Sequence, residues 1–274
     1  MKRSLMTLFL AISGAALAAD PATFTVTVSD SGYRAPAQTA AGYTQVVLQN
    51  TTQAPHSFLV LRFKDGTDEA RAKAVLAEYA ASESPEAQAN FDRALESFGG
   101  VTFAAPGSEK SYTVQLEAGR YAVVALGADE AGKNLADQGF FAAFDVTPGG
   151  NDATAPRADL MVHMKDFAFD LPETLPAGRQ VWEVMNMGDQ THHLILMRLQ
   201  DGKTRADLDA WMEKQDGPPP FDPVDAAEVL SKGKSSYMTF DLAQGDYVAS
   251  CFLPDLKTGA PHFTLGMLSF FSVK

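Results

Sequence analysis

Four residues in the second half of this chain could together bind a metal ion. Cys251 is the only cysteine among 274 residues, His262 follows it after ten residues, and Met267 follows His262 after four. His192 lies 59 residues before Cys251. A thiolate and a thioether suit Cu(I), and imidazoles also suit Cu(II), so a site that combines them can bind copper in both oxidation states. These residue types could therefore bind copper and exchange one electron at a time.

Packing is the alternative explanation for the same residue types. A free cysteine is commonly a small buried hydrophobe, and methionine fills irregular gaps in a core. His163 lies within a strand-like segment, where we expect a structural histidine; a Cu(I) site of histidine and methionine is the alternative there. We expect core packing for five methionines on strand-like segments, namely Met161, Met185, Met187, Met197 and Met238.

The composition excludes several other classes of protein. A formal net charge of −12 argues against nucleic-acid binding, which needs a basic face to neutralise phosphates. A single cysteine excludes an internal disulfide, a cysteine-rich zinc site and a four-thiolate iron–sulfur cluster. With 46% hydrophobic and 20% charged residues, the chain has the composition of a globular protein and not of a disordered one.

The first 18 residues have the pattern of a cleaved secretory signal peptide. Two basic residues precede an apolar stretch, and Ala16-Leu17-Ala18 places small residues at the −3 and −1 positions before Ala19. The apolar stretch is too short to be a permanent anchor, and no later segment is apolar over a whole membrane span. We therefore expect an exported protein, periplasmic or extracellular, without a membrane span. Secreted domains usually carry cysteines in pairs, so the unpaired Cys251 needs an explanation.

The remainder of the chain contains two copies of one sequence pattern. Residues 23–50 align without gaps with residues 159–186 at an offset of 136, and later segments align at an offset of 126. So long a period indicates two similar domains and not a solenoid. The predicted parts are a signal peptide at 1–18, a first domain at 19–149, a linker at 150–157 and a second domain at 158–274.

Each copy is expected to consist mainly of β-strands, because apolar and polar residues alternate along short segments that end in turn residues. The predicted strands are 24–28, 45–48, 57–63, 112–116, 121–126 and 140–146 in the first copy, and 160–164, 181–185, 194–199, 238–242, 247–252 and 267–273 in the second. We predict helical insertions at 68–98, 205–214 and 224–231. These elements predict an all-β fold of two tandem β-sandwiches, each with a short helical insertion.

The second half resembles the cupredoxin, or type 1 blue copper, family. The signature of that family is an early histidine followed by Cys-loop-His-x4-Met across the last two strands, and Cys251, His262 and Met267 have this order with the same gap of four. The resemblance implies Greek-key β-sandwiches and one type 1 copper ion per chain. It implies that His192, Cys251 and His262 form the copper plane, with Met267 as the axial donor. The loop from Cys251 to His262 is longer than in small plastocyanin-like members, and residues 255–259 are expected to form an inserted turn.

The early histidine of this signature could be either of two adjacent residues. His192 aligns with His56 of the first half, which lies in Pro55-His56-Ser57 and has the form that the family uses around its ligand. We therefore predict His192 as the ligand and keep His193 as the alternative.

The first half lacks most of the donors. Ala125 stands at the position of the cysteine, Phe140 stands at the position of the methionine, and no histidine occurs in the loop at 133–139. We expect the first half to have a structural role, either packing on the copper-binding half or docking a partner.

The resemblance implies one-electron transfer as the function. His262 would present its ring edge to a redox partner amid an apolar patch, and the acidic surface would steer a partner with a basic docking face. The predicted patch consists of Ala260, Pro261, Phe263 and Leu265.

Three competing functions would use the same residues differently. A copper oxidase or reductase is less favoured, because the His-x-His pairs of multicopper relatives are absent from the sequence. A periplasmic copper carrier or chaperone would bind Cu(I) without redox work. A metal-free tandem β-sandwich binding module would use Cys251 only as a buried hydrophobe.

Overall fold

The computed structural model describes residues 19–82, 84–214 and 216–274. The predicted signal peptide at 1–18 lies outside the described residues. Within the described part of the chain, no helix is long and apolar enough to cross a membrane.

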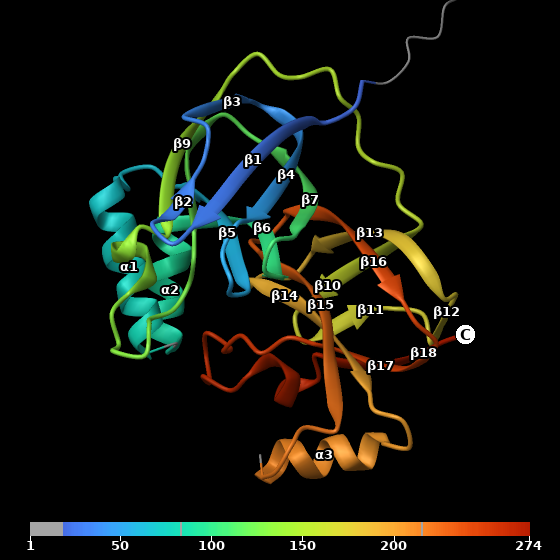
Figure 1. Ribbon diagram of the computed structural model, residues 1–274. Coiled ribbons are helices and arrows are strands. Elements are labelled where there is room, and N and C mark those ends of the chain that lie inside the picture. Colours follow the sequence, from blue (N-terminus) through green and yellow to red (C-terminus); the bar gives the residue numbers. More distant parts are fainter. Residues whose placement is uncertain (1–18, 83, 215) are drawn as a thin grey trace, which may run out of the picture.

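Two β-sheets run through both halves of the chain (Figure 1). One sheet has the strand order β11-β10-β13-β16-β7-β4-β1-β2, and the other has the order β12-β18-β17-β14-β15-β6-β5-β8-β9-β3. The strands of the first half are β1 (Ala22–Ser29), β2 (Gly32–Arg34), β3 (Gln38–Ala40), β4 (Gly42–Asn50), β5 (His56–Phe63), β6 (Leu95–Ala104), β7 (Glu109–Leu116), β8 (Gly119–Val124) and β9 (Phe141–Thr147). Those of the second half are β10 (Leu160–Lys165), β11 (Ala168–Asp170), β12 (Thr174–Leu175), β13 (Gly178–Asn186), β14 (His192–Leu199), β15 (Phe221–Leu230), β16 (Ser235–Leu242), β17 (Gly245–Ser250) and β18 (Leu268–Val273).

Each half contributes strands to both sheets, so each half is a β-sandwich. The alternation that predicts the strands is the alternation of burial: Phe24, Val26 and Val28 of β1 are at most 1% exposed, whereas the threonines between them face outward. In the second half, Trp182 of β13 is fully buried and packs against Phe240, with ring centroids 4.6 Å apart. The chain therefore has the predicted all-β fold of two tandem Greek-key sandwiches with short helical insertions.

The two halves are joined edge to edge in both sheets. β7 pairs with β16 in one sheet, and β6 pairs with β15 in the other. Side chains add to this junction: Lys110 forms an ion pair of 2.6 Å with Asp225, and the Ser97 backbone N–H donates to Ser231 Oγ at 2.8 Å. Because backbone pairing and a part-buried ion pair both cross the junction, we expect the halves to move as one body.

Among the described residues, three α-helices account for most of the helical insertions. They are α1 (Glu69–Ser82), α2 (Pro85–Ala94) and α3 (Arg205–Lys214), and Figure 1 shows α1 and α2 side by side at the first half and α3 at the far end of the second. Ser84 caps α2 by accepting the Ala87 N–H, and Pro85 occupies the first turn, where its missing N–H costs nothing.

Two parts of the helical prediction are wrong. Residues 224–231 do not form a helix; residues 224–230 belong to strand β15, and residues 95–98 belong to strand β6 instead of ending the first insertion. Asp225-Ala226-Ala227-Glu228 has good helix formers, but this segment lies between β14 and β6, where strand pairing and burial override local propensity. Pro223 is tolerated in β15 because β6 pairs with β15 only near Leu230 and leaves that end as an edge.

Candidate metal centre

Three side chains from distant parts of the sequence meet inside the second half. His192 begins β14, Cys251 directly follows β17, and His262 begins a short 3-10 helix, η2 (His262–Leu265). β14, β17 and β18 are neighbours in one sheet, so the strand ends bring these residues together. His192 and Cys251 are fully buried, and His262 is 1% exposed. Met267, also fully buried, directly precedes β18.

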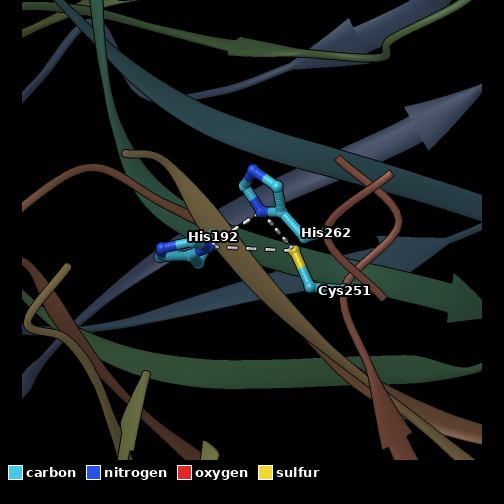
Figure 2. Close-up of side chains that lie close together, drawn as sticks. All are labelled: His192, Cys251 and His262. Atoms are coloured by element: carbon cyan, nitrogen blue, oxygen red, sulfur yellow. Dashed lines mark hydrogen bonds between the residues drawn. The ribbon is translucent and has the colours of Figure 1, made fainter. Parts of the chain in front are cut away.

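The nitrogen and sulfur atoms of the three side chains converge on one point (Figure 2). His192 Nδ1 and His262 Nδ1 are 3.0 Å apart, and Cys251 Sγ lies 3.4 Å from His262 Nδ1 and 4.0 Å from His192 Nδ1. Ligands at about 2.0–2.3 Å from one ion lie about 3–4 Å from each other. The donor atoms therefore have the spacing of three ligands around a single metal ion. Among the described residues, a cluster of three His, Cys, Asp or Glu side chains that could hold a metal is found here, at His192, Cys251 and His262.

Backbone hydrogen bonds fix the segments that carry these residues. Cys251 N–H donates to Met267 O at 3.2 Å, and Met267 N–H donates to His262 O at 3.0 Å. Phe263 N–H donates to Cys251 O at 2.9 Å. Gly266 ends η2 with φ 118°, a conformation that favours glycine, and the resulting turn brings the Met267 N–H back to the His262 carbonyl. The cysteine, histidine and methionine thus form one hydrogen-bonded unit.

Asp166 holds the ring of His192, a role that we did not predict from the sequence. The Nε2–H of His192 donates to Asp166 Oδ1 at 2.9 Å, which leaves Nδ1 unprotonated and facing the other donors. Partial burial would raise the pKa of Asp166, but hydrogen bonds from His192 and from the backbone N–H groups of Gln190 and Asp189 hold that pKa below its usual range. A signal was present, because Asp166 aligns with Asp30 at the offset of 136.

His193 points away from the three converging donors. Its Nε2 accepts the Phe252 backbone N–H at 2.8 Å, and its ring lies against the Phe252 ring. Neighbouring residues on a strand face opposite sides, which separates the ring of His193 from that of His192. Burial raises the pKa of the Cys251 thiol, and the backbone N–H groups of His193 and Leu253 act in the opposite direction by favouring the thiolate. His193 thus supports the segment of Cys251 with its ring, which binds the Phe252 N–H, and favours the thiolate with its backbone N–H.

The long loop between Cys251 and His262 is folded tightly. Asp255 Oδ2 accepts the Thr258 backbone N–H at 2.8 Å, and Gly259 N–H donates to Asp255 O at 2.8 Å, so the predicted turn at 255–259 forms. Gln190 Nε2 donates to Asp255 Oδ1 at 2.9 Å, and Gln190 Oε1 accepts the Leu256 N–H at 2.8 Å. The extra residues therefore form a braced turn.

Burial of His262 corrects one expectation. We expected its ring edge at the surface, but the residue is 1% exposed, and its buried Nε2 has no hydrogen-bond partner among the described residues. The Phe167 ring packs edge-on against it, with centroids 5.2 Å apart. Phe167 has φ 63°, an uncommon conformation for a bulky residue, and Gly266 packs against its carbonyl group.

Burial keeps all the donors neutral while no metal is bound. It lowers the pKa of His262 to about 4 and raises the pKa of Cys251 to about 11. It also lowers the pKa of His192, against the opposing effect of Asp166. Neutral imidazoles are ready to bind a metal, and a metal would displace the thiol proton, because the thiolate is the ligand form of cysteine.

The metal-free protein should lose stability as the pH falls from about 6.5 to about 4. Burial lowers the pKa of His262 from 6.5 to about 4 and that of His193 from 6.5 to about 3, so within this window the unfolded chain binds protons that the folded chain does not. The free energy of unfolding should therefore decrease by on the order of 2 kcal/mol as the pH falls through this window. Denaturant unfolding at a series of pH values checks this. A flat profile would contradict the burial of a neutral His262.

The first half has a cavity where the second half has its cluster. Ala125 N–H donates to Phe140 O at 3.0 Å, as Cys251 N–H does to Met267 O, and the His56 ring stacks on Phe140 at 5.5 Å. The space between His56, Ala125 and Phe140 belongs to a cavity of about 350 Å³. The backbone arrangement is thus kept in the first half, while two of the donor types are replaced by alanine and phenylalanine.

The first half also contacts the segment that carries His192. Asp92, on α2, accepts a hydrogen bond from Thr191 Oγ1 at 2.7 Å, directly before His192. Pro85, at the start of α2, lies against Gly259 of the long loop, since a Cβ on that glycine would come within 3.2 Å of it. The helical insertion of the first half therefore supports the loops of the second.

The fold and the site together define a class of protein: a β-sandwich with a buried His-Cys-His group and an adjacent methionine. No protein-family model matches the sequence, and no curated protein matches it.

Several solved structures of copper proteins are similar at low identity. Reduced auracyanin from Roseiflexus castenholzii is 21% identical over 42% of this chain and 95% of its own, with a TM-score of 0.30. A multicopper oxidase is 13% identical over 92% of this chain and 88% of its own, with a TM-score of 0.27. The copper-containing nitrite reductase of Thermus scotoductus is 11% identical over 92% of this chain and 61% of its own, with a TM-score of 0.26. At these identities and TM-scores, the likenesses assign no function to this chain.

Proposed function

We propose that this chain is an exported type 1 copper protein that transfers single electrons. One copper ion would be held in a plane by His192, Cys251 and His262, with Met267 as the axial donor. The observation that carries the proposal is the convergence of two imidazole nitrogens and one thiol within 4.0 Å of one another in a fully buried place. Bound copper supplies the Cu(II)/Cu(I) couple at this place.

The residues of the chain are suited to hold such a couple with little rearrangement. Asp166 fixes the tautomer of His192, and the backbone N–H groups of His193 and Leu253 favour the thiolate of Cys251. Burial excludes water from the donors, so that neither oxidation state can easily recruit a solvent ligand. We place His192 and not His193 in the ligand set, because the Nε2 of His193 is occupied by the Phe252 N–H.

The proposed organisation follows the sequence pattern. Residues 1–18 would be the signal peptide, residues 19–149 a first domain without copper, residues 150–157 a linker and residues 158–274 the copper-binding domain. The contacts of α2 with Thr191 and Gly259 support a structural role for the first domain.

The surface near the site supports docking of a redox partner. Phe252 and Leu265, which flank the buried cluster in sequence, are 41% and 39% exposed. The chain has a formal net charge of −12, so a partner with a basic docking face would be attracted over a long range at low salt.

Protein-film voltammetry of the copper-loaded protein tests electron transfer. We expect one reversible one-electron wave that persists over repeated scans and is absent from the metal-free protein. Tight Cu(I) binding without a reversible wave would contradict electron transfer and indicate a copper carrier. Absence of copper binding would leave the metal-free binding module, and turnover that needs a second copper per chain would indicate an oxidase.

A further inference from the structure

A second group of soft donors lies on the outer face of the sheet that contains β10 and β13. Met161 and Met187 are 58% and 55% exposed, and Met185 and His163 are half-buried. The residues that alternate with them, Val162, Met164 and Val184, are fully buried. The expectation that Met161, Met185 and Met187 fill the core is therefore wrong: these side chains face outward, whereas Met197 and Met238 are buried as expected.

The strand register brings these donors together. β10 and β13 are parallel neighbours, and His163 is the direct partner of Met185. Directly paired side chains on adjacent strands have Cβ atoms about 5 Å apart, and residues two apart on one strand are about 7 Å apart on the same face. Met161 is two residues before His163, and Met187 is two residues after Met185. The two methionines therefore lie on opposite sides of the His163–Met185 pair. From this register we expect three flexible thioethers to be able to reach one imidazole.

The corresponding positions in the first half carry hard polar groups. At the offset of 136, Met161, His163, Met185 and Met187 align with Thr25, Thr27, Gln49 and Thr51. Thr27 Oγ1 and Gln49 Oε1 are 3.4 Å apart, so the side chains at this pair of positions do meet across the strands. The half that has Cys251 thus has soft donors where the other half has hydroxyl and amide groups.

The ring of His163 has one nitrogen available to a metal. Its Nδ1 lies 3.6 Å from Asp170 Oδ2 of β11, so this carboxylate lies on the Nδ1 side of the ring. The Nε2 atom is the other ligand position.

We propose that Met161, His163 and Met185 form a second, surface site for Cu(I), with Met187 as a further donor. Thioethers and imidazole are ligands that Cu(I) prefers, and hard divalent ions are not expected there. One side of the proposed surface site is close to the buried cluster. Gly188, which follows Met187, lies against His192, since a Cβ on Gly188 would come within 2.6 Å of His192 Nε2. The surface site is separate from Cys251 and does not depend on the electron-transfer function.

Titration of the metal-free protein with Ag(I), a diamagnetic analogue of Cu(I), tests the site. With methionine methyl groups labelled for NMR, the Met267 signal reports on the buried cluster, and the Met161 and Met185 signals report on the surface site. We expect the Met161 and Met185 signals to shift and saturate together, and the Met212 signal on α3 to stay unchanged. The same titration with Cu(I) under anaerobic reducing conditions should move the same signals.

Two variants separate metal binding from chance contact. Met161→Leu combined with Met185→Leu should weaken Ag(I) binding at the surface site by about tenfold or more while the Met267 response stays unchanged. Met212→Leu, a matched change outside the cluster, should weaken neither response. The proposal would be overturned if the Met161 and Met185 signals do not shift in the unaltered protein, or if the double variant binds as tightly as that protein. Failure of the buried site alone would leave the surface site standing.

Discussion

Substitution of Cys251 by alanine is expected to abolish the intense visible absorption that the proposed copper centre should give. That absorption requires charge transfer from a thiolate to Cu(II), and Cys251 is the only cysteine in the chain. Its sulfur lies 3.4 Å and 4.0 Å from the imidazole nitrogens of His262 and His192. With the thiol removed, two imidazoles and a weak thioether remain, and we expect Cu(II) affinity to fall more than about a hundredfold.

A neighbouring variant provides the control for Cys251→Ala. Ser250 is also fully buried, and within the described part of the chain its hydroxyl has no hydrogen-bond partner. Ser250→Ala therefore removes one atom from the same segment without removing a metal ligand or a hydrogen bond, and it should keep the full absorption. Circular dichroism should show both variants folded. An unchanged visible band in folded Cys251→Ala would show that the colour does not come from this thiolate.

Substitution of Asp166 by asparagine is expected to weaken copper binding by about 10- to 100-fold. The Asp166 carboxylate accepts the Nε2–H of His192 at 2.9 Å and so keeps Nδ1 free for the metal. An amide group at this place has no negative charge, and it can donate to Nε2 and favour the wrong tautomer. Loss of the negative charge should also raise the reduction potential, because Cu(II) is destabilised more than Cu(I).

The potential distinguishes this role of Asp166 from a purely structural one. Asp189→Asn is the matched control, since the Asp189 carboxylate is 80% exposed and pairs with Lys232 rather than with His192. We expect the control to keep both copper affinity and potential. If Asp166→Asn lowers thermal stability but leaves affinity and potential unchanged, then Asp166 only braces its loop.

Much of the fold could be predicted because alternation of side chains along a strand is local information. Phe24, Val26 and Val28 indicate a strand by their spacing alone. The segment at 224–231 could not be predicted in this way, because its strand conformation depends on insertion between β14 and β6, and β6 belongs to the other half of the chain.

The candidate site could be predicted in part for the same reason. The spacing of Cys251, His262 and Met267 lies within one short segment, and the alignment with His56 pointed to His192. The role of Asp166 could not be predicted although Asp30 aligns with it, because only the folded chain shows that the carboxylate meets an imidazole. The burial of His262 under Phe167 depends on packing between distant loops, which no local pattern encodes.

Copper K-edge X-ray absorption of the protein loaded with one equivalent of copper tests the proposed copper centre most directly. We predict two nitrogen donors and one sulfur donor at short distances in the first coordination shell, with little change when Cu(II) is reduced to Cu(I). A coordination shell of nitrogen and oxygen atoms only, without a short copper–sulfur distance, would contradict a copper centre built on His192, Cys251 and His262.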